Sequence, residues 1–144
     1  MSVFYGNVIA ASGGNTSEAS RLFENTSAAT NTSAAAATLT GAEIAAGVIL
    51  RSGPTAIFSD TTDTAANIIA ALFGPNQSPG RIPIGVSLRL RIVNSSGFAQ
   101  TLLAGTGVTL VGTMTLATAT FRDFLVTIAG VNTVTITNIG SGTD

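Results

Sequence analysis

Few side chains of this protein could perform catalysis. The sequence has no histidine, cysteine, lysine or tryptophan, and its ionisable side chains are seven carboxylates, six arginines and one tyrosine. General acid–base catalysis most often uses histidine, and a nucleophilic serine, cysteine or lysine needs an activating base or neighbour. Because no such pair can be built from these residues, we expect no enzymatic activity and no catalytic residue.

Two aspartates offer the oxygen ligands that Ca²⁺ prefers. Asp60 and Asp63 are separated by Thr61 and Thr62. A Ca²⁺ site usually gathers about 6–8 oxygens, and two carboxylates just before a predicted helix are explained more simply by helix capping and the helix dipole. Without cysteine, a thiolate metal site is also excluded. We therefore predict no metal and no other cofactor.

One charged cluster is a candidate contact between subunits. Arg89 and Arg91 lie on the polar side of an alternating segment, and Asp123 is the carboxylate that we expect to pair with them. The simplest interpretation is a solvated or cross-strand charge pair. The functional interpretation is a contact across a subunit boundary, where arginine is enriched. We name these three residues as candidate subunit-interface residues.

The composition indicates a protein that buries surface against other chains. Only 9% of the residues are charged, against about 25% in an ordinary soluble domain, while 45% are hydrophobic and the mean hydropathy is +0.49. Charged surface is what resists association, so a chain this poor in charge is expected to form an oligomer.

Two classes of partner are not expected. Phosphate binding needs clustered basic residues, whereas the net charge is −1 and the arginines are dispersed, so we expect no nucleic acid. No apolar run approaches the ~18 residues of a membrane-spanning helix, so we expect no membrane partner. The N-terminal residues also lack the basic and apolar regions of a signal peptide.

Residues 1–39 are predicted to form a low-complexity N-terminal arm. Positions 11–39 are almost entirely Ala, Ser, Thr, Asn and Gly, which bury too little apolar surface to offset the entropy of ordering. Four larger apolar side chains interrupt this composition and are candidate anchors on a neighbouring subunit or a capsid: Phe4, Tyr5, Leu22 and Phe23. The alternative is that the arm folds back and buries these side chains in its own domain.

Residues 40–144 are predicted to form one β domain. Alternating apolar and polar residues indicate half-buried strands, which we expect at 86–92, 98–103, 108–116, 119–129 and 133–139. Segments 48–51 and 55–58 predict a hairpin, and two short helices are expected, one after Thr40 and one ending at Phe73. The predicted fold class is all-β and mainly antiparallel, a β-sandwich or jelly-roll-like domain with one or two short helices and an extended N-terminal arm.

Two stretches of this domain carry a family resemblance. The segments from Gly47 to Phe73, with VILRSGPTAIFSDTTDTAANIIAAL between them, and from Asn94 to Val131 resemble small capsid decoration (cement) and head-fibre proteins of tailed bacteriophages. The likeness covers the chain from about Leu39 onward and includes no catalytic or ligand-binding motif. It implies a β-sandwich or jelly-roll-like domain, often trimeric, that binds the major capsid protein and reinforces the shell.

The sequence thus predicts a structural virion protein on the outer surface of a bacteriophage capsid, with the major capsid protein and its own homotrimer as partners. The alternative is a phage fibre or receptor-binding module that recognises a host surface ligand. Glycan sites favour exposed tryptophan and tyrosine, and the chain has no tryptophan and one tyrosine. A third possibility, a bacterial surface or pilus-like subunit, requires an export route.

Overall fold

The structure, a computed structural model, describes residues 27–144, and β-strand is the main regular secondary structure of this range. Two short α-helices, α2 (Gly41–Ala45) and α3 (Ala65–Phe73), and one 3₁₀ turn, η1 (Pro79–Arg81), interrupt the strands. The prediction of a β-rich chain with one or two short helices is confirmed at this level. None of the helices in the described range is long and apolar enough to cross a membrane.

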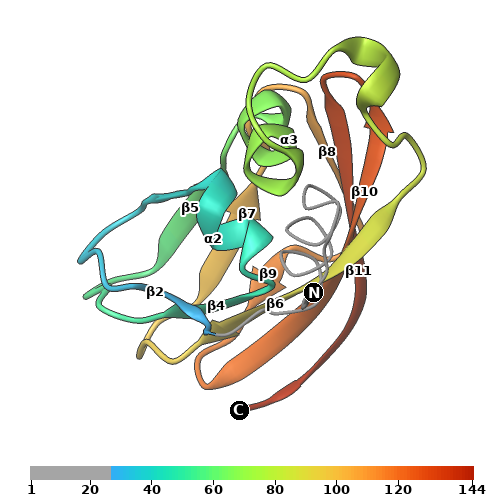
Figure 1. Cartoon of the computed structure of the whole chain (residues 1–144). Helices are drawn as coiled ribbons and strands as arrows, with labels where there is room; N and C mark the ends of the chain where they lie inside the picture. Colours follow the sequence, from blue (N-terminus) through green and yellow to red (C-terminus); the bar gives the residue numbers. More distant parts are fainter. Residues whose placement is uncertain (1–26) are drawn as a thin grey trace, which may run out of the picture.

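The strands form two sheets. The large sheet has six strands, in the order β2 (Ala29–Asn31), β4 (Val48–Arg51), β6 (Ser87–Asn94), β10 (Thr120–Gly130), β11 (Thr133–Thr143) and β8 (Val108–Val111). The small sheet has four, in the order β3 (Thr38–Leu39), β5 (Phe58–Thr62), β7 (Gln100–Leu103) and β9 (Thr115–Leu116). Figure 1 shows α2 and α3 between the small sheet and the long β10–β11 hairpin, which is drawn in orange and red.

The chain changes sheet at almost every step. From β2 to β10, consecutive strands alternate between the large and the small sheet, and only β10 and β11 follow one another in the same sheet. Strands separated by one such excursion lie side by side and parallel in the β2–β4, β4–β6, β3–β5 and β5–β7 pairs. The β8–β11 pair is also parallel, whereas β6–β10, β10–β11 and β7–β9 are antiparallel.

This mixed pairing corrects our expectations of topology. A mainly antiparallel or jelly-roll-like arrangement is not confirmed, because parallel pairs occur in both sheets. The predicted hairpin of segments 48–51 and 55–58 is wrong, since β4 and β5 lie in different sheets. Alternation along a strand reveals which side is buried, but it does not reveal which strand lies beside it. A short loop that crosses between the two sheets, such as residues 52–57, was therefore interpreted as a hairpin turn.

Part of the predicted arm pairs with the sheets. β2 and β3 both lie before residue 40, and they form parallel pairs with β4 and β5. Leu39 is fully buried in the core. Composition underestimated the order of this segment because its backbone hydrogen bonds and one leucine, rather than many apolar side chains, hold it in place. The β fold therefore begins before the predicted boundary at residue 40.

The two helices pack into one core shared by both sheets. The predicted capping box of α2 is present, because Thr40 Oγ1 accepts a hydrogen bond from Glu43 N (3.2 Å) and Glu43 Oε2 accepts one from Thr40 N (2.9 Å). Thr64 caps α3, which buries Ile68 and Leu72. The core residues from the sheets include Leu39, Ile49, Leu90, Ile92, Leu102, Leu116, Phe124, Val126, Ile128, Val134 and Ile136.

Candidate subunit-contact face

The side of the large sheet that points away from the core forms the outer face. The strand register arranges its residues in four cross-strand rows: Leu50, Val93, Phe121 and Gly142; Val48, Arg91, Asp123 and Gly140; Arg89, Leu125, Thr137 and Val111; Ser87, Thr127, Thr135 and Thr109. Within the described residues this face is open at its margins, since Leu50 remains 38% exposed and Val111 45%. The first row is apolar, the second carries an ion pair, and the fourth carries hydroxyl groups.

The structure brings Arg91 and Asp123 together, as the sequence indicated. They lie directly opposite each other on β6 and β10. Arg91 Nε donates to Asp123 Oδ1 at 2.7 Å and Arg91 Nη2 donates to Oδ2 at 2.9 Å, with side-chain exposures of 45% and 20%. The two parallel hydrogen bonds of this arrangement fix the orientation of the guanidinium group as well as its position.

An aromatic ring completes this part of the outer face. The Arg91 guanidinium carbon lies 3.9 Å from the ring centroid of Phe121, within the range of a cation–π contact. The ring rests against Gly142, where a Cβ atom would come within 2.7 Å of Phe121 Cζ. Glycine at this position lets the ring lie close to β11 beneath the arginine. The ion pair, ring and glycine together form a firmly positioned polar and aromatic surface.

Arg89 belongs to the same electrostatic cluster but is placed differently. It lies opposite Leu125, one row away from Asp123. The hydrogen bond from Arg91 lowers the pKa of Asp123 below its ordinary value of 3.8; partial burial opposes this effect, and the charges of Arg91 and Arg89 reinforce it. The three predicted interface residues therefore share one face, with Arg91 and Asp123 paired and Arg89 beside them.

The lowered pKa of Asp123 predicts a specific loss of stability in acid. Because the folded-state pKa is lower than the unfolded one, the contribution of this carboxylate is fully present above about pH 4 and disappears as the pH falls through the folded value. Urea unfolding between pH 5 and pH 2, approximately, should show a smaller decline in stability for Asp123→Asn than for the unchanged protein. Asp144→Asn, at the exposed C-terminal residue, is the control and should leave the decline intact. An equal decline in the free energy of unfolding of all three proteins would contradict the lowered pKa of Asp123.

A second ion pair, which the sequence analysis did not identify, is buried between the sheets. Arg51 in β4 and Asp60 in β5 both have fully buried side chains, and Arg51 Nε and Nη2 donate to Asp60 Oδ2 and Oδ1 at 2.6 and 3.1 Å. Gln100 Nε2 donates to Asp60 Oδ2 at 2.9 Å. Further N–H groups of Arg51 donate to the carbonyl groups of Asn31, Ser33, Ala35 and Ser52. The cluster ties both sheets to the segment before β3.

A signal for this cluster was present in the sequence. Arg51 ends an apolar run that reads Val-Ile-Leu, and a charged side chain at a strand end beside the core needs a carboxylate partner. Asp60 comes two residues after the next predicted strand, 55–58, and we interpreted it as a helix-capping residue, whereas the structure places it within β5. The error arose because two short strands were taken to be a hairpin, whereas the ion pair connects different sheets.

The structure does not bring Asp60 and Asp63 to a common site. Asp60 accepts hydrogen bonds from Arg51, Gln100 and the backbone of Ala37. Burial raises the pKa of Asp63, but hydrogen bonds from Asn67 and the backbone N–H groups of Gly41 and Thr64 outweigh it and lower the pKa overall. The Asp63 carboxylate thus accepts backbone hydrogen bonds at the N-terminal ends of both helices, which agrees with its predicted capping role. Among residues 27–144, no group of three or more potential metal ligands is present.

The predicted arm anchors, Phe4, Tyr5, Leu22 and Phe23, lie outside the described residues. The described chain therefore offers two features for comparison with other proteins: the two mixed sheets and the outer face with its Arg91–Asp123 pair. No known protein family, curated protein or solved structure matches this chain.

Proposed function

We propose that this protein is a structural virion component that decorates and reinforces a bacteriophage capsid. In this proposal it forms a homotrimer on the outer capsid surface and binds the major capsid protein. It has no enzymatic activity, needs no cofactor, and binds neither nucleic acid nor a membrane. The observation that carries the proposal is the outer face, where an apolar row lies directly beside the Arg91–Asp123 pair. Protein interfaces commonly combine apolar and aromatic contacts with arginine in this way.

The architecture is suited to a mechanical role. Both sheets contribute to one core, which supports the finer description of the fold as a β-sandwich. The buried Arg51–Asp60 pair and the Asn94 side chain, whose Nδ2 donates to the carbonyl of Leu116 at 3.3 Å, connect the two sheets. A rigid module that presents a broad face can add contacts between capsid subunits without any chemical step.

The proposed trimer predicts a measurable response to a charge on the outer face. Leu125 is half-buried in the centre of this face, opposite Arg89. Leu125→Glu should shift the protein from trimer to monomer in size-exclusion chromatography with light scattering, because the carboxylate must lose water at the interface. The chain itself should remain folded, since Arg89 can pair with the new carboxylate.

Thr38→Glu, an exposed position on the small sheet, provides the matched control and should remain trimeric. A monodisperse monomer of the unchanged protein at micromolar concentration would refute the trimer. Equal dissociation by both substitutions would show that this face is not the specific interface.

Capsid decoration itself can be tested by adding the purified protein to capsids that lack it. The expected result is saturable binding, regular density on the outer shell in electron micrographs and greater resistance of the capsids to heat. Leu125→Glu should bind more weakly and Thr38→Glu should bind normally. Absence of the protein from virions analysed by mass spectrometry would overturn the proposal.

A phage fibre or receptor-binding module remains the second candidate. The observation that favours it is the exposure of Ile57 (78%) and Phe98 (38%) in loops that lie close together, since Phe58 N donates to Ala99 O at 3.2 Å. Exposed apolar loops at one end of a β domain can bind a host surface ligand. Binding of the isolated protein to host cells, lost in Ile57→Ser with Phe98→Ser, would favour this function over decoration.

A further inference from the structure

The outermost strand of the large sheet, β8, has a free edge. β11 pairs with it on one side, and within residues 27–144 no strand lies on the other side. The N–H of Val134 in β11 donates to Gly107 O at 3.1 Å, so Gly107 and Thr109 turn their backbone groups toward β11. Val108 and Leu110, which alternate with them, turn theirs toward the free edge. An added strand could form hydrogen bonds with these groups.

The corresponding edge of the small sheet is closed by a side chain. In β9, the backbone of Thr115 points away from β7, because the neighbouring Met114 carbonyl accepts a hydrogen bond from Leu102 N of β7 at 2.9 Å. Arg122 of β10 reaches this edge, and its Nε and Nη2 donate to Thr115 O at 3.1 and 2.7 Å. A strand that approached β9 would have to displace this arginine.

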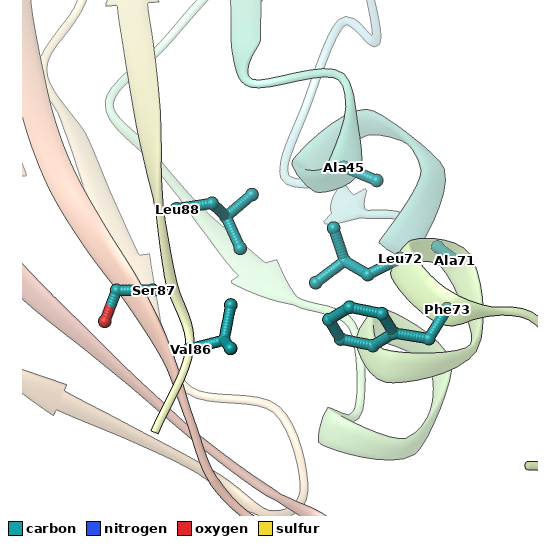
Figure 2. Close-up of a pocket in the computed structure, with 7 residues that line it drawn as sticks. All are labelled: Ala45, Ala71, Leu72, Phe73, Val86, Ser87 and Leu88. Atoms are coloured by element: carbon teal, nitrogen blue, oxygen red, sulfur yellow. The ribbon is translucent and has the colours of Figure 1, made fainter. Parts of the chain in front are cut away.

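A second unpaired stretch of backbone lies at the beginning of β6, where β4 does not yet pair with it. Figure 2 shows Val86 and Leu88 pointing toward Leu72 and Phe73 of α3 across a groove of about 120 Å³. The groove is lined by apolar side chains and Ser87 and contains no charged residue, so its chemistry selects no particular occupant. The edge of β8 defines its partner more closely.

The chemistry of the β8 edge favours a second copy of the same edge. The sequence contains no charged residue between Arg91 and Arg122, and β8 lies within this interval. Natural edge strands often avoid pairing through lysine, proline, bulges or short length, and β8 has only the last of these. Two such edges can meet without repulsion between like charges, whereas a charged strand would find no counter-charge in β8.

The free backbone groups select one antiparallel register. The N–H of Val108 is already used, because it donates to Gly105 O at 3.0 Å. The N–H and carbonyl of Leu110 are both free, so about a two-fold axis Leu110 of each copy can exchange two hydrogen bonds with Leu110 of the other. This register places Thr109 opposite Val111 of the second copy on the outer face. Val111, which is 45% exposed, thereby gains a cross-strand neighbour.

We propose that β8 pairs antiparallel with β8 of a second copy, with Leu110 opposite Leu110. The two large sheets then form one continuous sheet, and both outer faces lie on the same side because the two-fold axis is perpendicular to the sheet. The contact is separate from the trimer contact on the outer face and does not depend on capsid binding. An edge of four residues buries much less than the about 1,200–2,000 Å² of a stable interface, so it joins copies that are already at high local concentration.

The absence of cysteine from the sequence permits a direct test by disulfide formation. Thr109→Cys and Val111→Cys are prepared as separate full-length proteins, mixed at high concentration, treated with a mild oxidant, and analysed on a non-reducing gel and by peptide mass spectrometry. We expect disulfide-linked dimers of the two variants, because directly opposite residues of a non-hydrogen-bonded pair have Cα atoms about 4.5 Å apart. Each variant alone is the matched control and should cross-link several-fold less, since its two copies lie on a diagonal about 7–8 Å apart.

The outcomes separate edge pairing from other contacts. More cross-linking of Thr109→Cys alone than of the mixture would show a different register, and equal or absent cross-linking in all three samples would show that the edges do not pair. Each of these results would overturn the inference.

The same experiment with Leu125→Glu added to both proteins excludes the outer face as the source of the disulfide. This substitution removes the proposed trimer contact, and the mixture should still cross-link. Loss of the disulfide in this background would show that it forms across the outer face and would overturn the inference. Capsid binding has no part in these measurements, so a failure of the proposed function would leave them unchanged.

A second measurement tests the backbone groups of the edge without engineered cysteines. Leu110→Pro removes the N–H at the free edge but none of the hydrogen bonds to β11, whereas Leu110→Ala loses the side chain and keeps the N–H. In sedimentation equilibrium at increasing concentration, Leu110→Pro should weaken association beyond the trimer by about tenfold or more, and Leu110→Ala should weaken it much less. Equal association of the two variants would count against pairing through this edge. Thermal unfolding checks that each variant is folded, and the cross-linking result stands whether or not Leu110→Pro folds.

Discussion

Replacing Asp60 with alanine is expected to lower the free energy of unfolding by about 3–5 kcal/mol, the cost of leaving a buried charge without its partner. Arg51 and Asp60 are both fully buried, and their two hydrogen bonds join β4 of the large sheet to β5 of the small one. The substitution would leave the guanidinium group with backbone carbonyls as acceptors but without a counter-charge. Chemical denaturation followed by circular dichroism measures the loss.

Asp123→Ala provides a closely matched control. It removes the same residue type from a bidentate pair with arginine, but the Arg91 side chain of this pair is 45% exposed. Exposed ion pairs contribute little because water solvates each partner almost as well. We expect the loss of stability in Asp123→Ala to be several-fold smaller than in Asp60→Ala.

The double substitution Arg51→Met with Asp60→Leu distinguishes an unpaired charge from a general defect in packing. It removes both charges and retains apolar volume, but it leaves the carbonyl groups that accepted from Arg51 without donors, so it should recover only part of the stability lost in Asp60→Ala. An Asp60→Ala protein as stable as Asp123→Ala would mean that water reaches Arg51, and that this pair does not hold the sheets together.

The sequence predicted the burial pattern of individual strands better than their arrangement. In β6, Leu90 and Ile92 are buried while Arg89 and Arg91 are exposed, as alternation required. The partners of each strand could not be predicted, because a short loop can form a hairpin or cross to another sheet. Residues 52–57 cross between sheets, although Gly53 and Pro54 are also typical of a hairpin turn.

The same distinction applies to the candidate site. Arg91 and Asp123 could be predicted as a pair because each lies on the polar side of a strand and the two strands are neighbours. Arg51 and Asp60 could not, because their contact depends on how two sheets stack across the core. The contribution of Phe121 was also missed, since it requires the close approach of Gly142 from β11. Local alternation carries no information about either contact.

The second large effect on stability is expected when the chain is shortened from its N-terminal end. A chain of residues 27–144 should fold cooperatively, whereas a chain of residues 40–144, which matches the domain predicted from composition, should not. The shorter chain lacks β2 and β3, and it lacks Leu39, which is fully buried. Truncating a buried leucine to alanine alone typically costs about 2–5 kcal/mol, a large part of the stability of a small domain.

The loss in the shorter chain extends beyond that leucine. Residues 27–39 also supply the carbonyl groups of Ser33 and Ala35, which accept hydrogen bonds from Arg51 at 2.9 and 2.6 Å, and the N–H of Ala37, which donates to Asp60 at 2.8 Å. Their removal would open the buried ion pair to water on one side. Far-ultraviolet circular dichroism and thermal unfolding of the two chains test this directly. A cooperative transition in residues 40–144, at a Tm close to that of residues 27–144, would show that β2 and β3 are dispensable and that the compositional boundary at residue 40 was correct.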